Sequence, residues 1–410
     1  MQSRAAAPTG ERRAFRMTTW VCVAFAHFVA RLVQPALGQT PVGISVPAQL
    51  SVRQILQISG QRNVVYAALA PKGQLVLARA QPAELTLFDS SGNRIWSRNT
   101  RMPVAGGMTI CRDTIIALES GDTWHLVRSR LSSGKELART ELDIARGSDP
   151  FILGCSGGAA VIRILVRMRV GALGLAAVQF PERNVVLVFP DGELRPTSFL
   201  AIDSSIQITP PAYFGRMAMR PPFAPTPGLA FVPPGNLLYS SGTDAGVEIH
   251  DLRGKRIGSV KLTANQTQFD EGEINKQRTE WVERSAKRFP AAIRAETLFA
   301  RVAALETTTR GLSLGRMLNS QTGDVLVRRR DMDRRPLLEL DSTVYDVFDG
   351  RQNGRIRGRI TLPAGHFPLA FDGSRIVTSF VRPTTLASEP SMQDVFVFLI
   401  VSNANSKESK

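Results

Sequence analysis

Three histidines are the candidate catalytic bases of this chain once an N-terminal leader is set aside: His125, His250 and His366. A nucleophilic triad places such a base beside a serine or cysteine and a carboxylate. His125 and His250 fall at strand positions of a repeat described below, which favours a structural role, and His366 is expected to be solvated in a linker. Neither a phosphate-binding loop nor a Cys-x-x-Cys or His-x-His pair is present. The sequence therefore predicts no catalytic residue and no zinc site.

Two cysteines, Cys111 and Cys155, remain after the leader. They occupy similar points of consecutive repeat units, each shortly before an expected hairpin turn. An even pair of cysteines in an exported protein can form a disulfide, and the inner strands of neighbouring units would lie close together. Two buried thiols are the alternative, and the spacing leaves both possibilities open.

A cluster of arginines marks one later segment and consists of Arg328, Arg329, Arg330, Arg334 and Arg335. It can be a solvated loop or a contact for an acidic partner. The whole chain carries a formal net charge of +16, which becomes +12 without residues 1–38. Such a charge attracts polyanions in general. No helix-turn-helix, zinc-finger or RNA-binding signature accompanies it, so we predict no nucleic-acid partner.

A secretory signal peptide is predicted over residues 1–38. The stretch 18–33 is mostly apolar, residues 36–38 are suited to cleavage, and four arginines precede them: Arg4, Arg12, Arg13 and Arg16. A membrane anchor is the alternative, but the apolar stretch is short for a span and contains Arg31. We therefore expect a periplasmic or extracellular protein whose mature chain has no membrane span.

A strand, a glycine turn and a second strand recur along the chain as a sequence repeat. This repeat predicts the elements that would position any site. Glycine supplies the positive φ of a tight turn, and a preceding Asp or Ser can bond the backbone of that turn. Copies occur at residues 85–95, 124–137, 185–194, 247–257 and 345–356, with a degraded sixth at 395–400.

A second hairpin precedes each copy, at residues 64–80, 108–118, 151–178, 228–240, 315–328 and 369–380. Two hairpins make four antiparallel strands, which is one propeller blade. The sequence thus predicts an all-β, six-bladed β-propeller with four-stranded antiparallel blades over residues 41–401. A β-sandwich or a pair of barrels is the alternative. We expect the strand Ser51–Ile58 to join the last blade and close the ring.

Two segments depart from the repeat. Residues 269–309 are rich in Glu, Arg, Lys and Ala, and their apolar residues recur near helical spacing. They predict a helical insertion between blades four and five. The polar residues 402–410 predict a disordered tail.

Phrases such as Leu87-Phe88-Asp89-Ser90-Ser91-Gly92 and Tyr345-Asp346-Val347-Phe348-Asp349-Gly350 resemble those of secreted bacterial six-bladed β-propellers of the NHL-like type. The resemblance covers roughly residues 50–400 and implies a fold far more than a chemistry. Some six-bladed relatives are lactonases that hold calcium at the inner strand ends. The matching candidates here are Asp113, Asp203, Asn236 and Asn319, although Asp and Asn are expected in turns in any case.

Together these observations predict an exported, monomeric, non-enzymatic binding or scaffolding propeller. Its partner would be a protein or a polysaccharide, and no cofactor is implied. The alternative is a calcium-dependent, lactonase-like hydrolase with its site at the axial mouth of the propeller.

Overall fold

The structure is a computed structural model of the 410-residue chain, and contacts divide it into two compact units, residues 1–46 and 47–410. The described residues are 48–144, 149–169, 177–201, 207–209, 228–240, 246–261, 272, 275–276, 279–280, 283, 314–329, 343–350, 355–382 and 392–402. The predicted signal peptide lies outside them. Ser402 still belongs to a strand, and the rest of the predicted tail lies outside the described residues.

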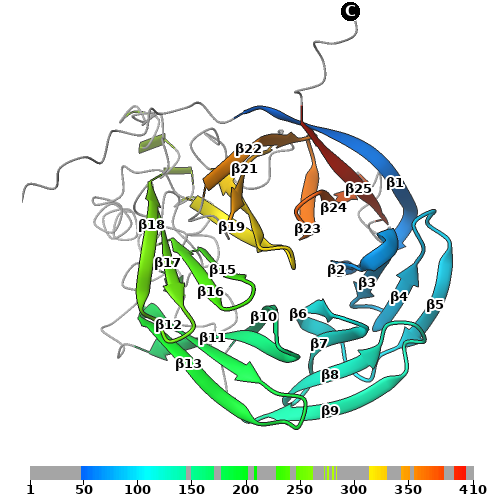
Figure 1. Cartoon of the computed structure of the whole chain (residues 1–410), viewed down its shortest axis with the longest axis horizontal. Helices are drawn as coiled ribbons and strands as arrows, with labels where there is room; N and C mark the ends of the chain where they lie inside the picture. The colour runs from blue at the N-terminus through cyan, green and yellow to red at the C-terminus, as the bar shows by residue number, and fades with distance from the viewer. Residues whose placement is uncertain are drawn as a thin grey trace, which may run out of the picture. The chain divides into compact units, whose positions relative to one another are not determined.

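The described residues of the second unit form six antiparallel sheets, which we number as blades I to VI (Figure 1). Blade I contains β2 (Val64–Leu69), β3 (Leu75–Arg79), β4 (Glu84–Phe88) and β5 (Arg94–Asn99). Blade II contains β6 (Val104–Cys111), β7 (Thr114–Ser120), β8 (Trp124–Arg130) and β9 (Glu136–Leu142). Blade III contains β10 (Asp149–Ser156), β11 (Ala159–Arg169), β12 (Ala177–Val188) and β13 (Leu194–Ala201), and β14 (Gln207–Thr209) also pairs with β12.

The remaining blades follow the same plan. Blade IV contains β15 (Gly228–Val232), β16 (Asn236–Ser240), β17 (Gly246–Asp251) and β18 (Arg256–Lys261). Blade V contains β19 (Leu314–Asn319), β20 (Asp324–Arg329), β21 (Thr343–Asp349) and β22 (Arg355–Leu362). Blade VI contains β23 (His366–Phe371), β24 (Arg375–Val381), β25 (Met392–Ser402) and, as its outermost strand, β1 (Leu50–Arg62). The predicted six-bladed, four-stranded architecture is confirmed.

The ring is closed by the N-terminal strand of this unit. β1 pairs antiparallel with β25 from Leu50 opposite Ser402 to Arg62 opposite Met392. The innermost strands β2, β6, β10, β15, β19 and β23 contact their neighbours in cyclic order, including β23 with β2. The predicted closing strand Ser51–Ile58 is therefore confirmed, and the two ends of the described chain share one blade (Figure 1).

The hairpin turns have the predicted chemistry. Gly92 and Gly254 have φ values of 87° and 80°. Ahead of them, the carboxylate of Asp89 accepts hydrogen bonds from the backbone N–H of Ser91 and Asn93, at 2.8 and 2.9 Å. Asp251 accepts in the same way from Arg253 and Lys255. Each turn is thus stabilised by its own aspartate, and the hydrogen bonds from Asn93 hold the pKa of Asp89 below its usual value.

The hydrophobic core lies between blades rather than inside one layer. Ile58, Leu75 and Val397, for example, pack together where blade VI meets blade I. Five further clusters fill the other junctions. Successive strand residues point to opposite faces, so each blade supplies apolar side chains to both of its neighbours. For this reason many of its strands are nearly continuous runs of apolar residues.

His366 is not in a solvated linker, and that prediction is wrong. It begins β23, where its Nδ1 lies 2.9 Å from the hydroxyl of Thr378. Its ring packs against Phe380, Phe396 and Phe398, with centroids 4.8–5.4 Å away. Phe396 and Phe398 belong to β25. They are distant from His366 in the sequence, so the sequence alone does not indicate this contact.

We expect acid to destabilise the protein through His366. Burial lowers the pKa of His366 from its usual 6.5, because the imidazolium would lose hydration among these rings. The unfolded chain therefore binds this proton more readily, and the free energy of unfolding falls as the pH drops from 6.5 towards the lower pKa of the folded state. Urea denaturation between pH 7 and 5 should show a weaker pH dependence for His366→Phe than for His125→Gln, which keeps His366. Equal slopes would contradict this.

The predicted helical insertion over 269–309 is not supported. Most of it lies outside the described residues. Six scattered positions are described within it, and all six are exposed with helical backbone: Gly272, Asn275, Lys276, Thr279, Glu280 and Glu283. They do not make up an element.

Candidate functional site

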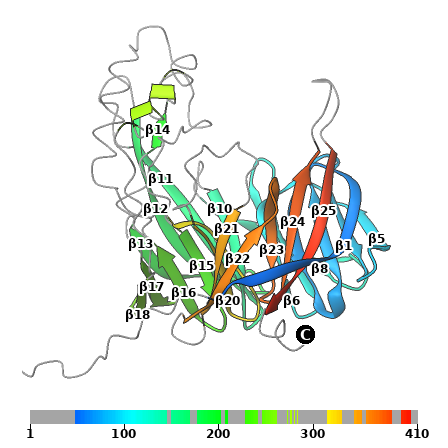
Figure 2. The same cartoon turned by 90° about the horizontal axis from the view of Figure 1, so that it is seen from above.

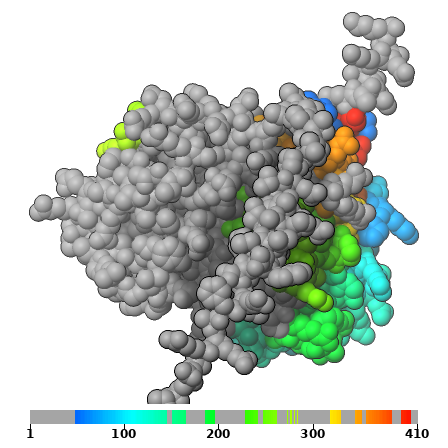
Figure 3. Space-filling model, turned by 60° about the vertical axis from the view of Figure 1, so that its left-hand side comes forward, coloured from blue at the N-terminus to red at the C-terminus, as the bar shows by residue number. Residues whose placement is uncertain are grey.

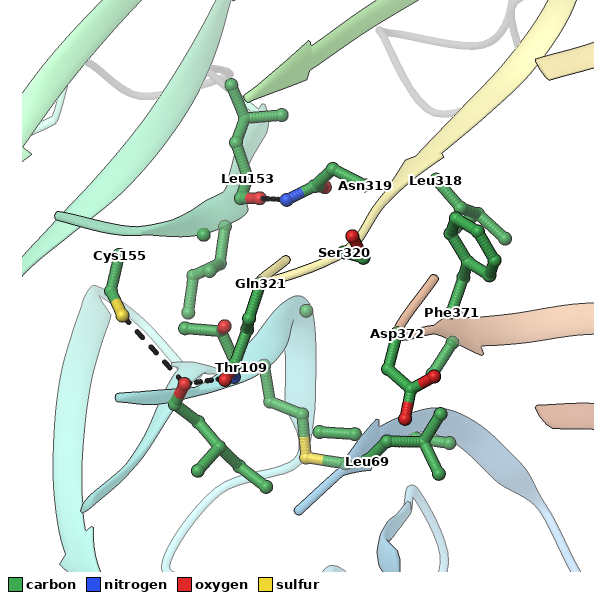
Figure 4. Close-up of a pocket in the computed structure, with 18 of the residues that line it drawn as sticks. Leu69, Thr109, Leu153, Cys155, Leu318, Asn319, Ser320, Gln321, Phe371 and Asp372 are labelled. Carbon is green, nitrogen blue, oxygen red and sulfur yellow. Dashed lines mark hydrogen bonds between the residues drawn. The ribbon is translucent and has the colours of Figure 1, made fainter. Parts of the chain in front are cut away.

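A cavity of about 320 Å³ lies on the axis of the ring (Figure 4). All six innermost strands line it. Its walls are mainly aliphatic and aromatic, and include Phe151, Phe231, Leu318 and Phe371. Small-ligand sites in proteins have this size and this apolar character. The described part of the chain therefore contains a candidate site at the one place where every blade contributes.

Hydrogen bonds join different blades at one end of the cavity. The innermost strands end there, at the turns that join the first and second strands of each blade, and we call this side the turn face. Five side chains donate to backbone carbonyls of other blades: Arg375 to Ala70, Gln321 to Ile110, Asn319 to Leu153, Ser156 to Pro234 and Thr322 to Asp372. Carbonyls at the ends of strands need hydrogen-bond partners, and these contacts supply them while connecting the blades at the turn face.

Blade V supplies three of these five donors. Asn319 ends β19, and Gln321 and Thr322 lie in the turn that follows it. In Figure 4 the side chain of Gln321 extends from this turn towards β6, where its amide donates a hydrogen bond to the backbone carbonyl of Ile110. Blades II and V lie opposite one another in a six-bladed ring, so Gln321 spans the axis. Sequence reasoning missed Gln321, because its partner lies 211 residues away.

Charge in the cavity is neutralised within blade VI. Asp372 is the only carboxylate among the described residues that line it. One carboxylate oxygen accepts from the backbone N–H of Ser374 and Arg375, at 3.0 and 2.7 Å, and the other from the guanidinium of Arg375, at 2.6 and 2.7 Å. Both oxygens are thus committed to their own turn, which leaves amides, hydroxyls and apolar groups to face a ligand.

The predicted calcium ligands are dispersed. Asn319 lines the cavity, but its amide donates to Leu153. Asp113 is exposed in the turn between β6 and β7, and Asn236 begins β16 outside the cavity lining. Asp203 lies outside the described residues. Within the described part of the chain, no group of three or more His, Cys, Asp or Glu residues is placed to hold a metal ion.

A disulfide joins Cys111 of β6 to Cys155 of β10, with Cα atoms 6.0 Å apart. It links blades II and III at the turn face, and Cys155 lines the cavity. Ile110, the partner of Gln321, precedes Cys111 directly. The disulfide therefore restrains the strand end on which the axial hydrogen bond depends.

The other predicted site residues that the structure describes lie outside the cavity lining. His250 is buried in β17, where its ring nitrogens contact the Gly254 carbonyl and the Glu248 carboxylate at 3.1 and 3.0 Å. His125 lies in β8. Arg328 is half-buried in β20, Arg329 ends that strand, and Arg330, Arg334 and Arg335 lie outside the described residues.

A Gly-x-Ser-x-Gly sequence overlaps the start of β19. Residues 311–315 have the spacing Gly-x-Ser-x-Gly, which in hydrolases forms a turn between a strand and a helix. Here Leu314 begins β19, so the motif leads into an innermost strand, and Ser313 lies outside the described residues. Its described part lacks the context of a nucleophile elbow.

The fold and the axial cavity define a six-bladed β-propeller. No family model matches the chain, and no curated protein matches it. A member of the DUF4221 family from Bacteroides vulgatus is 8% identical, with a TM-score of 0.48, over 87% of this chain and 99% of that one. A luciferin-regenerating enzyme is 7% identical, with a TM-score of 0.44, over 86% and 97%. Regucalcin, a calcium-binding protein from Agrobacterium tumefaciens, is 10% identical, with a TM-score of 0.41, over 87% and 97%. The fold assignment rests on the sheets themselves, and the NHL-like type stays a prediction.

Among the described residues, no helix is long and apolar enough to cross a bilayer.

Proposed function

We propose that this protein is an exported, non-enzymatic binding propeller that holds a small, uncharged and largely apolar molecule in its axial cavity. The observation that carries the proposal is the cavity itself, about 320 Å³ in volume and lined by all six innermost strands. A folded protein or a polysaccharide is too large for it, so such partners would use the outer surface.

The electrostatics of the cavity favour an uncharged ligand. An isolated charge entering an apolar space loses hydration that only a fixed counter-charge could replace. Asp372 and Arg375 already neutralise one another. The remaining polar groups, such as the Thr109 hydroxyl and the Asn319 side-chain oxygen, suit a ligand with one or two hydrogen-bonding groups.

The predicted signal peptide over residues 1–38 supports export of the mature chain to the periplasm or out of the cell. The Cys111–Cys155 disulfide suits the oxidising conditions of those compartments.

The calcium-dependent hydrolase stays the alternative, supported by the position of Asn319 in the cavity. Equilibrium dialysis against calcium separates the two functions. Stoichiometric calcium that is lost in Asn319→Ala, together with lactone turnover that chelation abolishes, would replace our proposal with the hydrolase.

The uncharged fluorophore N-phenyl-1-naphthylamine provides a direct test of the proposed site. We expect its fluorescence to rise on the wild-type protein. Thr109→Trp places an indole in the cavity and should weaken that binding by at least ~10-fold, because it displaces the apolar volume that the probe would bury. Thr123→Trp adds the same indole at an exposed turn and should leave binding unchanged. Equal binding by both variants would place the probe elsewhere and refute the proposed site.

A further inference from the structure

A large aliphatic side chain is exposed at the same repeat position of four successive blades. It lies two or three residues after the turn glycine, near the start of the outermost strand. The four residues are Ile95, Leu137, Leu194 and Ile257, with 47, 47, 40 and 54% of their surface exposed. One exposed aliphatic residue needs no explanation, but one on each of blades I to IV forms a pattern.

All four lie at the rim of the turn face. The strands of a blade are antiparallel, so the outermost strand begins on the side where the innermost strand ends. The innermost strands end at the turn face, as the residues that line the cavity there show. Figure 2 shows the strands running between the two faces, and Figure 3 shows part of the outer surface of blades II to IV in cyan to green.

A cation lies within two residues of each aliphatic side chain: Arg94, Lys135, Arg195 and Arg256. Arg195 and Arg256 pair with glutamates. Arg94 and Lys135 are exposed and form no ion pair with described residues, and the same holds for five further cations of the turn face: Lys72, Arg112, Arg253, Lys255 and Arg355. The carboxylates of Asp89, Asp251 and Asp372 are instead bound by the backbone N–H groups of their own turns.

Exposed aliphatic side chains together with exposed cations fit a lipid surface better than a protein or a polysaccharide. The aliphatic residues are single and a blade apart, whereas a protein interface needs a contiguous patch of about 800 Å² on each side. An acidic polysaccharide would use the cations but not the aliphatic groups. A lipid surface uses both, since aliphatic side chains enter the interfacial layer while Lys and Arg attract anionic headgroups.

We propose that the turn-face rim docks this propeller onto an anionic lipid surface. The contact is peripheral. The proposal does not depend on what the cavity binds.

Co-sedimentation with vesicles tests the docking surface on the full mature chain. We expect binding to phosphatidylcholine vesicles with 30% phosphatidylglycerol, roughly 10-fold weaker binding to pure phosphatidylcholine, and release by 0.5 M NaCl. The variant Ile95→Ser/Leu137→Ser/Leu194→Ser/Ile257→Ser should bind the anionic vesicles at least ~10-fold more weakly. The matched control is Phe367→Ser/Val381→Ser, whose residues are 49 and 39% exposed at the opposite face, and it should bind normally.

A charge variant makes the test independent of changes in folding. Arg94→Gln/Lys135→Gln/Lys255→Gln alters only exposed side chains and should lose the preference for anionic vesicles. The proposal is overturned if the wild-type protein binds a sulfated polysaccharide but no vesicle, if it binds neither, or if the control weakens vesicle binding as much as the rim variants.

Discussion

Removal of residues 1–62 is expected to prevent the protein from folding, whereas removal of residues 1–47 should leave it folded. The longer deletion takes away β1, whose pairing with β25 closes the ring. It also removes Ile58 from the core between blades VI and I. Ten residue pairs are lost, and at about 0.5–1.5 kcal/mol for each hydrogen bond the cost is of order 5 kcal/mol or more. That is comparable to the whole stability of a typical protein.

Size-exclusion chromatography and thermal denaturation of the two truncated proteins measure this effect. The longer deletion leaves β25 as an open strand edge, and such edges pair with other chains, so we expect aggregates in place of a monomer. A monomeric, cooperatively melting protein that lacks residues 1–62 would mean that β1 does not close the ring.

Phe231→Ala is expected to lower the free energy of unfolding by about 3–5 kcal/mol. Phe231 is fully buried, and its ring lies in the cluster between blades III and IV with Leu153 and Leu229. It also lines the axial cavity. Its removal therefore costs both the transfer of the ring and the space left behind, and it enlarges the cavity.

Urea denaturation of this variant is compared with that of Phe367→Ala, which removes the same ring from a site 49% exposed. The control should change the free energy of unfolding by less than about 0.5 kcal/mol. If the two variants unfold alike, Phe231 does not pack at the junction of blades III and IV.

The fold could be predicted because its determinants are local and recur. Gly92 and Gly254 each follow an aspartate that bonds the turn backbone, and the alternation around them is typical of paired strands. Closure could also be predicted, since the strand Ser51–Ile58 had no partner within the first blade. The repeat is therefore almost sufficient to predict the architecture.

The site depends on contacts across the ring, and for that reason the sequence could not predict it. Gln321 and Ile110 meet only because blades II and V lie opposite each other. Asp113 and Asn319 are both turn-associated residues, yet only Asn319 lines the cavity. The packing of His366 cannot be predicted for the same reason, because its neighbours Phe396 and Phe398 belong to another strand.

The most direct test of the binding proposal is a crystal structure of the protein soaked with N-phenyl-1-naphthylamine. We predict density for the probe inside the axial cavity, in contact with Thr109, Phe231 and Asn319, with the turn-face hydrogen bond of Gln321 intact. A cavity filled by side chains, or a probe bound only on the outer surface, would contradict the proposal.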